Sequence, residues 1–150
     1  EIDKDGFLKI TGRTKEMFKT SGGKYVIPPL LEGELKQSLF IEQVMVVGEN
    51  EKMPAAIIQP NFEYLKDWAK ENHITYSSNN DLITNEKVLE EITKAVKICN
   101  NSFGKWEQIK VFKLTPDEWT LEAGHLTPTM KMKRAVIKNI YKDLYDSIYK

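Results

Sequence analysis

Two basic stretches of the chain contain the side chains best suited to chemistry on a phosphorylated molecule. They span residues 12–26 and residues 126–134. A lysine ammonium is a compact point charge, so one that is held beside a phosphate under attack stabilises the developing charge and orients the reactants. Paired glycines leave no side chain between a backbone and a ligand. The two stretches therefore supply cations for phosphate chemistry and, in the first of them, a turn over which a ligand can lie.

The first stretch reads GRTKEMFKTSGGKYV and combines paired glycines with flanking cations. Its candidate ligand-binding residues are Arg13, Lys15, Lys19, Gly22, Gly23 and Lys24. A phosphate-rich or pantetheine-bearing ligand could lie across such a glycine turn. Composition alone favours the alternative, a solvent-exposed hairpin whose strands carry lysines for solubility. Neither a Walker A sequence nor GxGxxG occurs, so we do not expect the chain to hold the phosphates of ATP unaided.

The second stretch reads LTPTMKMKR and brings Lys131, Lys133 and Arg134 close to the last predicted helix. One of the lysines could face the negative charge that develops when a carboxylate attacks the α-phosphate of ATP. A basic, solvated loop is an equally good interpretation of this pattern taken alone. If the stretch is functional, the residue types by themselves leave the choice between Lys131 and Lys133 open.

The composition limits the kinds of partner that the chain can have. Its 150 residues suffice for one domain with a core, and 22 acidic residues balance 22 basic ones. The zero net charge argues against nucleic acid as a partner, so any anion site is local. The single cysteine, Cys99, excludes an internal disulfide and fits a reducing compartment, so we expect a cytoplasmic protein. The two histidines, His73 and His125, have no neighbours at ligand spacing, and we expect no metal site.

The apolar and turn-forming residues predict the elements that must position these two stretches. Residues 6–11 alternate between apolar and polar and predict a short strand. Residues 17–20 and 24–27 predict a hairpin across the glycine turn, where glycine supplies a positive φ at little cost. The paired prolines Pro28-Pro29 are typical of a helix start, here of a helix over residues 30–39.

The remaining elements follow from hydrophobic periodicity. Residues 44–47 and 55–58 predict two strands that pair in antiparallel fashion, and Asn61 is a candidate cap for a helix over residues 62–71. The other expected elements are a loop over residues 72–83, a helix over 85–101, a strand at 109–112 and a last helix after Arg134. This order predicts an α+β domain over residues 1–150, with a small, mostly antiparallel sheet, a β-hairpin and flanking helices.

Together and in this order, the two stretches resemble the carboxy-terminal domain of the acyl-adenylate-forming enzymes. The segments TSGGKYV and LTPT-x-K-x-KR are similar to those of the long-chain fatty acyl-CoA synthetases within that superfamily. The resemblance covers essentially the whole chain. It implies a mobile lid domain of an AMP-forming long-chain fatty acid–CoA ligase, whose N-terminal adenylation domain is absent from this sequence. The start of the chain in mid-pattern, without Met, fits that expectation.

The resemblance also implies roles for individual residues. It places Arg13 against the ribose hydroxyls of the adenylate and makes Lys15, within residues 12–16, the hinge about which the lid swings. Aspartate is the commoner hinge residue in the superfamily, and lysine is a known alternative. The remaining implied site residues are Gly22 and Gly23 in the pantetheine tunnel, Lys24 near the nucleotide or CoA, and Lys131 as the catalytic lysine of adenylation. Met130 departs from the pattern, because many members have glycine before that lysine.

The implied reaction has two steps. Fatty acid and Mg-ATP give acyl-AMP and pyrophosphate, and CoA then displaces AMP to form acyl-CoA. ATP, CoA and Mg²⁺ are expected to be held mainly by the N-terminal domain, so we expect the isolated chain to be inactive. The alternatives are a lid that serves an enzyme loading a carrier protein, and a stand-alone module that binds anions or nucleic acid. Long-chain substrates leave peripheral contact with a membrane open.

Overall fold

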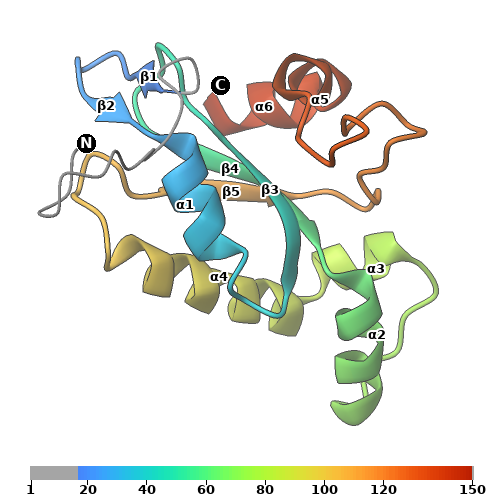
Figure 1. Cartoon of the computed structure of the whole chain (residues 1–150). Coiled ribbons are helices and arrows are strands. Elements are labelled where there is room, and N and C mark those ends of the chain that lie inside the picture. The colour runs from blue at the N-terminus through green and yellow to red at the C-terminus, as the bar shows by residue number, and fades with distance from the viewer. Residues whose placement is uncertain (1–16, 150) are drawn as a thin grey trace, which may run out of the picture.

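A sheet lies at the centre of the part of the chain that the computed structural model describes, residues 17–149 (Figure 1). Within that part it has three strands in the order β3-β4-β5. β3 (Ile41–Val47) and β4 (Ala55–Pro60) are antiparallel, as predicted, and β5 (Val111–Leu114) pairs with β4 in parallel. The expected strand at residues 6–11 lies outside the described residues.

The alternation of side chains along β4 builds two cores, one on each face of the sheet. Ala56 and Ile58 belong to a core shared with α1 (Pro28–Leu35) and α4 (Glu86–Asn100). Ala55 and Ile57 belong to a second core. Every residue of β4 is buried, as expected for a central strand that is covered on both faces. The sheet is therefore the middle layer between two sets of helices (Figure 1).

The second core is closed by a C-terminal pair of helices, α5 (Arg134–Ile140) and α6 (Lys142–Tyr149). The sequence predicted one continuous helix here. The chain leaves helical geometry at Tyr141, where φ is −103° and ψ is 30°. The apolar spacing continues across this single residue, so local periodicity could not reveal the break. Tyr141 is buried against other rings, which indicates that tertiary packing determines its conformation.

The first core is completed by two further helices. α2 (Phe62–Glu71) begins as predicted, because the Asn61 side chain accepts a hydrogen bond from the N–H of Tyr64 at 3.1 Å. The loop predicted over residues 72–83 is wrong in its second half, which forms α3 (Asn79–Thr84). There the side chain of Ser78 caps the helix. Residue types that were interpreted as turn formers act here as helix caps.

The predicted hairpin is confirmed as β1 (Phe18–Lys19) and β2 (Tyr25–Val26), which pair in antiparallel register. Pro28 and Pro29 occupy the first turn of α1, so this helix begins and ends earlier than predicted. The α+β class and the mostly antiparallel sheet are confirmed, with β4-β5 as the parallel exception. Among residues 17–149, no helix combines the length and apolar character needed to cross a bilayer.

Candidate functional site

Lys131 lies on a tight turn whose two ends are joined by backbone hydrogen bonds. Leu126 and Met132 form an antiparallel bridge, and the N–H of Thr127 donates to the carbonyl of Lys131 at 2.8 Å. In return, the N–H of Lys131 donates to Oγ1 of Thr127 at 3.1 Å. Both backbone polar groups of Lys131 are thus occupied within the turn, while its side chain is exposed. We call residues 126–132 the lysine turn.

Met130 adopts a backbone conformation that favours glycine, the residue that the resemblance implies at this position. Its φ is 65°, in the left-handed region that residues with a Cβ seldom adopt. Its N–H donates to the carbonyl of Thr127 at 2.8 Å, which closes the tip of the turn. The side chain of Met130 is 62% exposed and contributes little packing that could offset the strain. The positive φ is therefore imposed by the turn that presents Lys131.

Lys131 and Lys133 leave the turn on the same outer surface. They are two positions apart in an extended segment, and Met132 between them packs against the second core. Both lysines are exposed, and within residues 17–149 neither forms a salt bridge. They differ in the backbone, because Lys133 precedes α5 and its N–H donates to the carbonyl of His125 at 2.8 Å. Exposure alone therefore does not separate the two candidates.

The start of α5, just after the lysine turn, is fixed to α1 and the sheet by an ion pair that the sequence did not reveal. Arg134 donates two hydrogen bonds to the carboxylate of Glu32, at 2.8 and 2.6 Å. Glu32 is buried, and its Oε2 also accepts the N–H of Val46 at 2.9 Å. This carboxylate thus joins α1, β3 and the start of α5. The available signal was an acidic residue on the buried face of α1, between Leu31 and Leu35.

The glycine hairpin, residues 18–26, is a second exposed turn, and backbone hydrogen bonds hold it in place. Gly23 has a φ of 83°, and its N–H donates to the carbonyl of Thr20 at 3.0 Å. Gly22 is surrounded by open space, since a Cβ there would meet no atom within 4 Å. The N–H of Ser21 donates to the carbonyl of Glu51 at 2.8 Å, which fixes the hairpin to the turn between β3 and β4. The predicted glycine surface is therefore open on one side and anchored on the other.

The lysines of the hairpin lie over aromatic rings. Nζ of Lys24 is 5.7 Å from the ring centre of Trp106, and Nζ of Lys19 is 5.6 Å from that of Tyr25. Trp106 follows α4 and is half exposed. Cation–π contacts of this kind orient an ammonium without neutralising it. Lys24 and Trp106 are distant in the sequence, so local patterns gave no signal for this contact.

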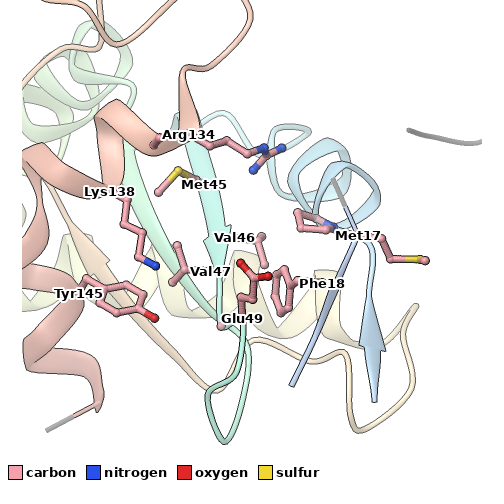
Figure 2. Close-up of a pocket in the computed structure, with 12 residues that line it drawn as sticks. Met17, Phe18, Met45, Val46, Val47, Glu49, Arg134, Lys138 and Tyr145 are labelled. Carbon is pink, nitrogen blue, oxygen red and sulfur yellow. The ribbon is translucent and has the colours of Figure 1, made fainter. Parts of the chain in front are cut away.

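The two basic stretches lie on different sides of a cavity of about 310 Å³. Figure 2 shows Phe18 of β1 and the preceding Met17 on one side and Arg134 and Lys138 of α5 on the other. Lys131 and the glycine turn are not among the described residues that line it. The structure therefore brings the flanks of the two stretches together but keeps their candidate site residues apart. Arg13 and Lys15 lie outside the described residues.

Cys99 takes no part in this arrangement. It lies in the first core on α4, and burial raises the pKa of its thiol to about 11. A thiol with such a pKa is not ionised near neutral pH and is a poor nucleophile. Cys99 therefore serves packing in the first core.

The comparisons with known proteins agree on one family. The family profile described as "AMP-binding enzyme C-terminal domain" matches residues 16–150. Long-chain-fatty-acid–CoA ligase FadD15 of Mycobacterium tuberculosis is 38% identical over 149 residues, which cover 99% of this chain and 25% of that protein. Human long-chain-fatty-acid–CoA ligase 1 is 34% identical over 148 residues, which cover 97% of this chain and 21% of that protein. The chain thus spans about a quarter of the length of the relatives that it matches.

Solved structures agree in fold. The adenylation domain of a carboxylate reductase from Mycobacterium chelonae superposes with a TM-score of 0.76 at 21% identity, over 99% of this chain and 24% of that one. A fatty acyl CoA synthetase from Mycobacterium tuberculosis gives a TM-score of 0.58 at 20% identity, over 96% of this chain and 23% of that one. Together with the profile match and the identities to the ligases, this shows that the chain belongs to the family of C-terminal domains of AMP-binding enzymes.

Proposed function

We propose that this chain is the mobile C-terminal lid of an AMP-forming long-chain fatty acid–CoA ligase. The observation that carries the proposal is the lysine turn, which presents the Lys131 ammonium on a backbone held at both ends. The names of the relatives, long-chain-fatty-acid–CoA ligases from a bacterium and from human, support the substrate class. The partner of the lid is the N-terminal adenylation domain of the same protein.

In the first half-reaction, the carboxylate of the fatty acid attacks the α-phosphorus of ATP and pyrophosphate leaves. Lys131 acts on the negative charge that builds on the phosphate oxygens, and its exposed ammonium is available for this role. Mg²⁺ enters with ATP and is bound mainly by the N-terminal domain. In residues 17–149, no three histidine, cysteine or acidic side chains gather as metal ligands. The single cysteine fits a cytoplasmic enzyme, and a long-chain acid as substrate favours peripheral contact with a membrane.

In the second half-reaction, the thiol of CoA attacks the acyl carbon and AMP leaves. We assign Gly22 and Gly23 to the pantetheine path, and the open space beside Gly22 supports this role. Lys24, held by Trp106, faces the nucleotide or CoA. Arg13 binds the ribose of the adenylate, and Lys15 is the hinge. Because the lysine turn and the glycine hairpin occupy different parts of the domain, a swing of the lid would exchange one for the other in the site.

The test compares Lys131→Ala with Lys133→Ala in the full-length ligase. Acyl-AMP formation from palmitate and ATP is timed separately from the transfer of supplied acyl-AMP to CoA. We expect Lys131→Ala to lower the adenylation rate by about 10²–10³, the cost of losing one preorganised charge, while transfer persists. Lys133→Ala is the matched control, because it removes an ammonium that is also exposed, two residues away.

Two outcomes would contradict the assignment. If Lys133→Ala abolishes adenylation while Lys131→Ala does not, the two lysines exchange roles. If neither variant affects either step, the lysine turn has no part in adenylation and the proposed function fails. The isolated chain offers a further check, because acyl-CoA formation by residues 1–150 alone would contradict the role of a lid.

A further inference from the structure

Three buried rings form a cluster next to the lysine turn. The ring centroids of Trp119, His125 and Tyr141 are 6.0 Å apart in each pair. The interplanar angle is 12° between Trp119 and His125, 29° between Trp119 and Tyr141, and 17° between His125 and Tyr141. Their residues are 4%, 4% and 6% exposed. His125 is the residue immediately before the turn. This cluster contains a titratable ring that none of the roles assigned above uses.

The hydrogen bonds of His125 fix which nitrogen carries the proton. The N–H of Thr120 donates to Nδ1 at 3.2 Å, so Nδ1 must be an acceptor and the neutral ring carries its proton on Nε2. Nε2 lies 3.3 Å from the hydroxyl of Tyr141. That hydroxyl donates onward to Oδ2 of Asp117 at 3.2 Å. The result is a directed chain that runs from Thr120 through the imidazole and the phenol to the carboxylate.

The backbone of His125 transmits the position of the ring to the lysine turn. Its N–H donates to the carbonyl of Thr120 at 3.0 Å, and its carbonyl accepts the N–H of Lys133 at 2.8 Å. The next residue, Leu126, is fully buried and pairs with Met132. A movement of the imidazole ring would therefore displace the backbone at both ends of the segment that carries Lys131.

We propose that His125, oriented by Thr120, Tyr141 and Asp117, is a positioning residue that holds the lysine turn in its adenylating geometry, and that protonation of His125 releases the turn. The proposal rests on the proposed role of Lys131 in adenylation. A proton on Nδ1 would face the N–H of Thr120, placing two donors against each other where one hydrogen bond now lies. The ring would then have to move, and the backbone of the turn would move with it.

The groups around His125 determine whether its pKa is raised or lowered. Burial lowers the pKa of His125 below its ordinary value of 6.5, and the negative charge of Asp117 and a backbone hydrogen bond with Thr120 oppose that effect. Burial also raises the pKa of Tyr141 to about 12, so the phenol keeps its proton and remains a donor to Asp117. The groups that face the ring are Asp117 after β5, Trp119 and Thr120 in the following segment, and Tyr141 between α5 and α6. Adenylation should therefore be lost on the acid side.

The experiment measures adenylation and CoA transfer in the full-length ligase between about pH 5 and pH 8, the range in which histidine titrates. Below the pKa of His125, the adenylation rate should fall about tenfold per pH unit, which gives its pH profile an acid limb. The rate of transfer from supplied acyl-AMP should show no such fall. Asp117→Asn should move the acid limb to lower pH, because it removes the charge that favours the imidazolium. The new amide oxygen can still accept from Tyr141, so the fold is retained.

Two further variants complete the design. Glu118→Gln removes the same charge from the exposed neighbouring residue and should leave the limb in place. His125→Asn keeps an acceptor near the N–H of Thr120 but cannot titrate, so its acid limb should disappear. If Asp117→Asn leaves the limb unmoved and His125→Asn retains it, the positioning role is overturned.

Hydrogen exchange at the amides of Lys131 and Lys133 separates this proposal from the proposed function. We expect His125→Ala, which removes the ring and its acceptor, to accelerate exchange at both amides in the full-length enzyme, since each donates a hydrogen bond within the supported segment. Faster exchange with unchanged adenylation would mean that His125 positions the turn but that Lys131 is not the adenylation lysine. Unchanged exchange would contradict the positioning role, whatever Lys131→Ala does to adenylation.

Discussion

Glu32 is the residue whose loss should most directly loosen the start of α5. Its buried carboxylate binds both the guanidinium of Arg134 and the N–H of Val46. Glu32→Ala leaves a partly buried cation and a buried amide without this acceptor. Removing one partner of a buried pair costs about 3–5 kcal/mol, and the 30% exposure of the Arg134 side chain reduces the expected cost to the bottom of that range or below it.

The prediction is measured as the free energy of unfolding in urea. We expect Glu32→Ala to lower it by about 2–3 kcal/mol, after allowance for solvent around Arg134. Glu34→Ala, on the exposed side of the same helix, is the matched control and should change stability little. Equal unfolding midpoints for the two variants would mean that the carboxylate does not anchor α5.

For single residues, the sequence predicted the contacts made with near neighbours in the chain and missed the contacts made with residues far away in the sequence. The cap at Asn61 and the exposed glycine turn depend on residues within a few positions, and both are confirmed. The contact of Glu32 with Arg134 joins residues 102 positions apart, and that of Tyr141 with His125 joins residues 16 apart. His125 was therefore interpreted only as a poor metal ligand, because its hydrogen-bonding partners exist only in the folded chain.

Among the elements, β3 depends on a glycine at its end. Gly48 has a φ of 140°, and a Cβ there would lie 2.9 Å from the carbonyl oxygen of Met53 and 3.1 Å from Cα of Pro54. Backbone contacts of this kind cannot be relieved by rotating a side chain. Gly48→Ala should therefore destabilise the chain by about 1–3 kcal/mol, the cost of holding an L-residue in a glycine-only region.

Gly33 provides the control with the opposite sign. It lies inside α1, and a Cβ there would meet no atom within 4 Å. Gly33→Ala should stabilise the chain by about 0.5–1 kcal/mol, because it removes backbone freedom from the unfolded state. Thermal unfolding of both variants in one buffer provides the test. A stabilised Gly48→Ala would show that the turn after β3 can adopt another conformation.

The elements also show where local patterns lose their predictive power. Runs of apolar residues located β3 and β4, which contribute to both cores, and helical periodicity located α2 and α4, each of which buries one regular face in the first core. The parallel pairing of β5 with β4 follows a long connection through α2, α3 and α4, and no local pattern encodes it. The break at Tyr141 was missed for a related reason, since burial against Trp119 and His125 outweighs helical continuity.

For the whole molecule, the separation of the two basic stretches argues for motion. The lysine turn and the glycine hairpin are each held rigidly, one by His125 and Arg134 and the other by the turn after β3. Neither can reach the position of the other by local rearrangement. If both act on the same acyl group, as we propose, the domain must rotate as a body between the half-reactions. The rotation then belongs to the segment that precedes β1, in which Lys15 is the proposed hinge.

A substitution at Lys15 tests that rotation. Lys15→Pro fixes φ near about −65° and prevents the change in backbone torsion that a hinge requires. We expect the full-length Lys15→Pro enzyme to form acyl-AMP from palmitate. Its rate of CoA transfer should fall about tenfold or more, because the lid cannot leave its adenylating orientation. Lys15→Ala is the control, since it removes the ammonium and leaves the torsions free, and it should retain both steps. Single-turnover measurements distinguish the two steps. If proline affects them equally, or if alanine reproduces its effect, then Lys15 acts through its charge or not at all, and the lid must turn about another residue.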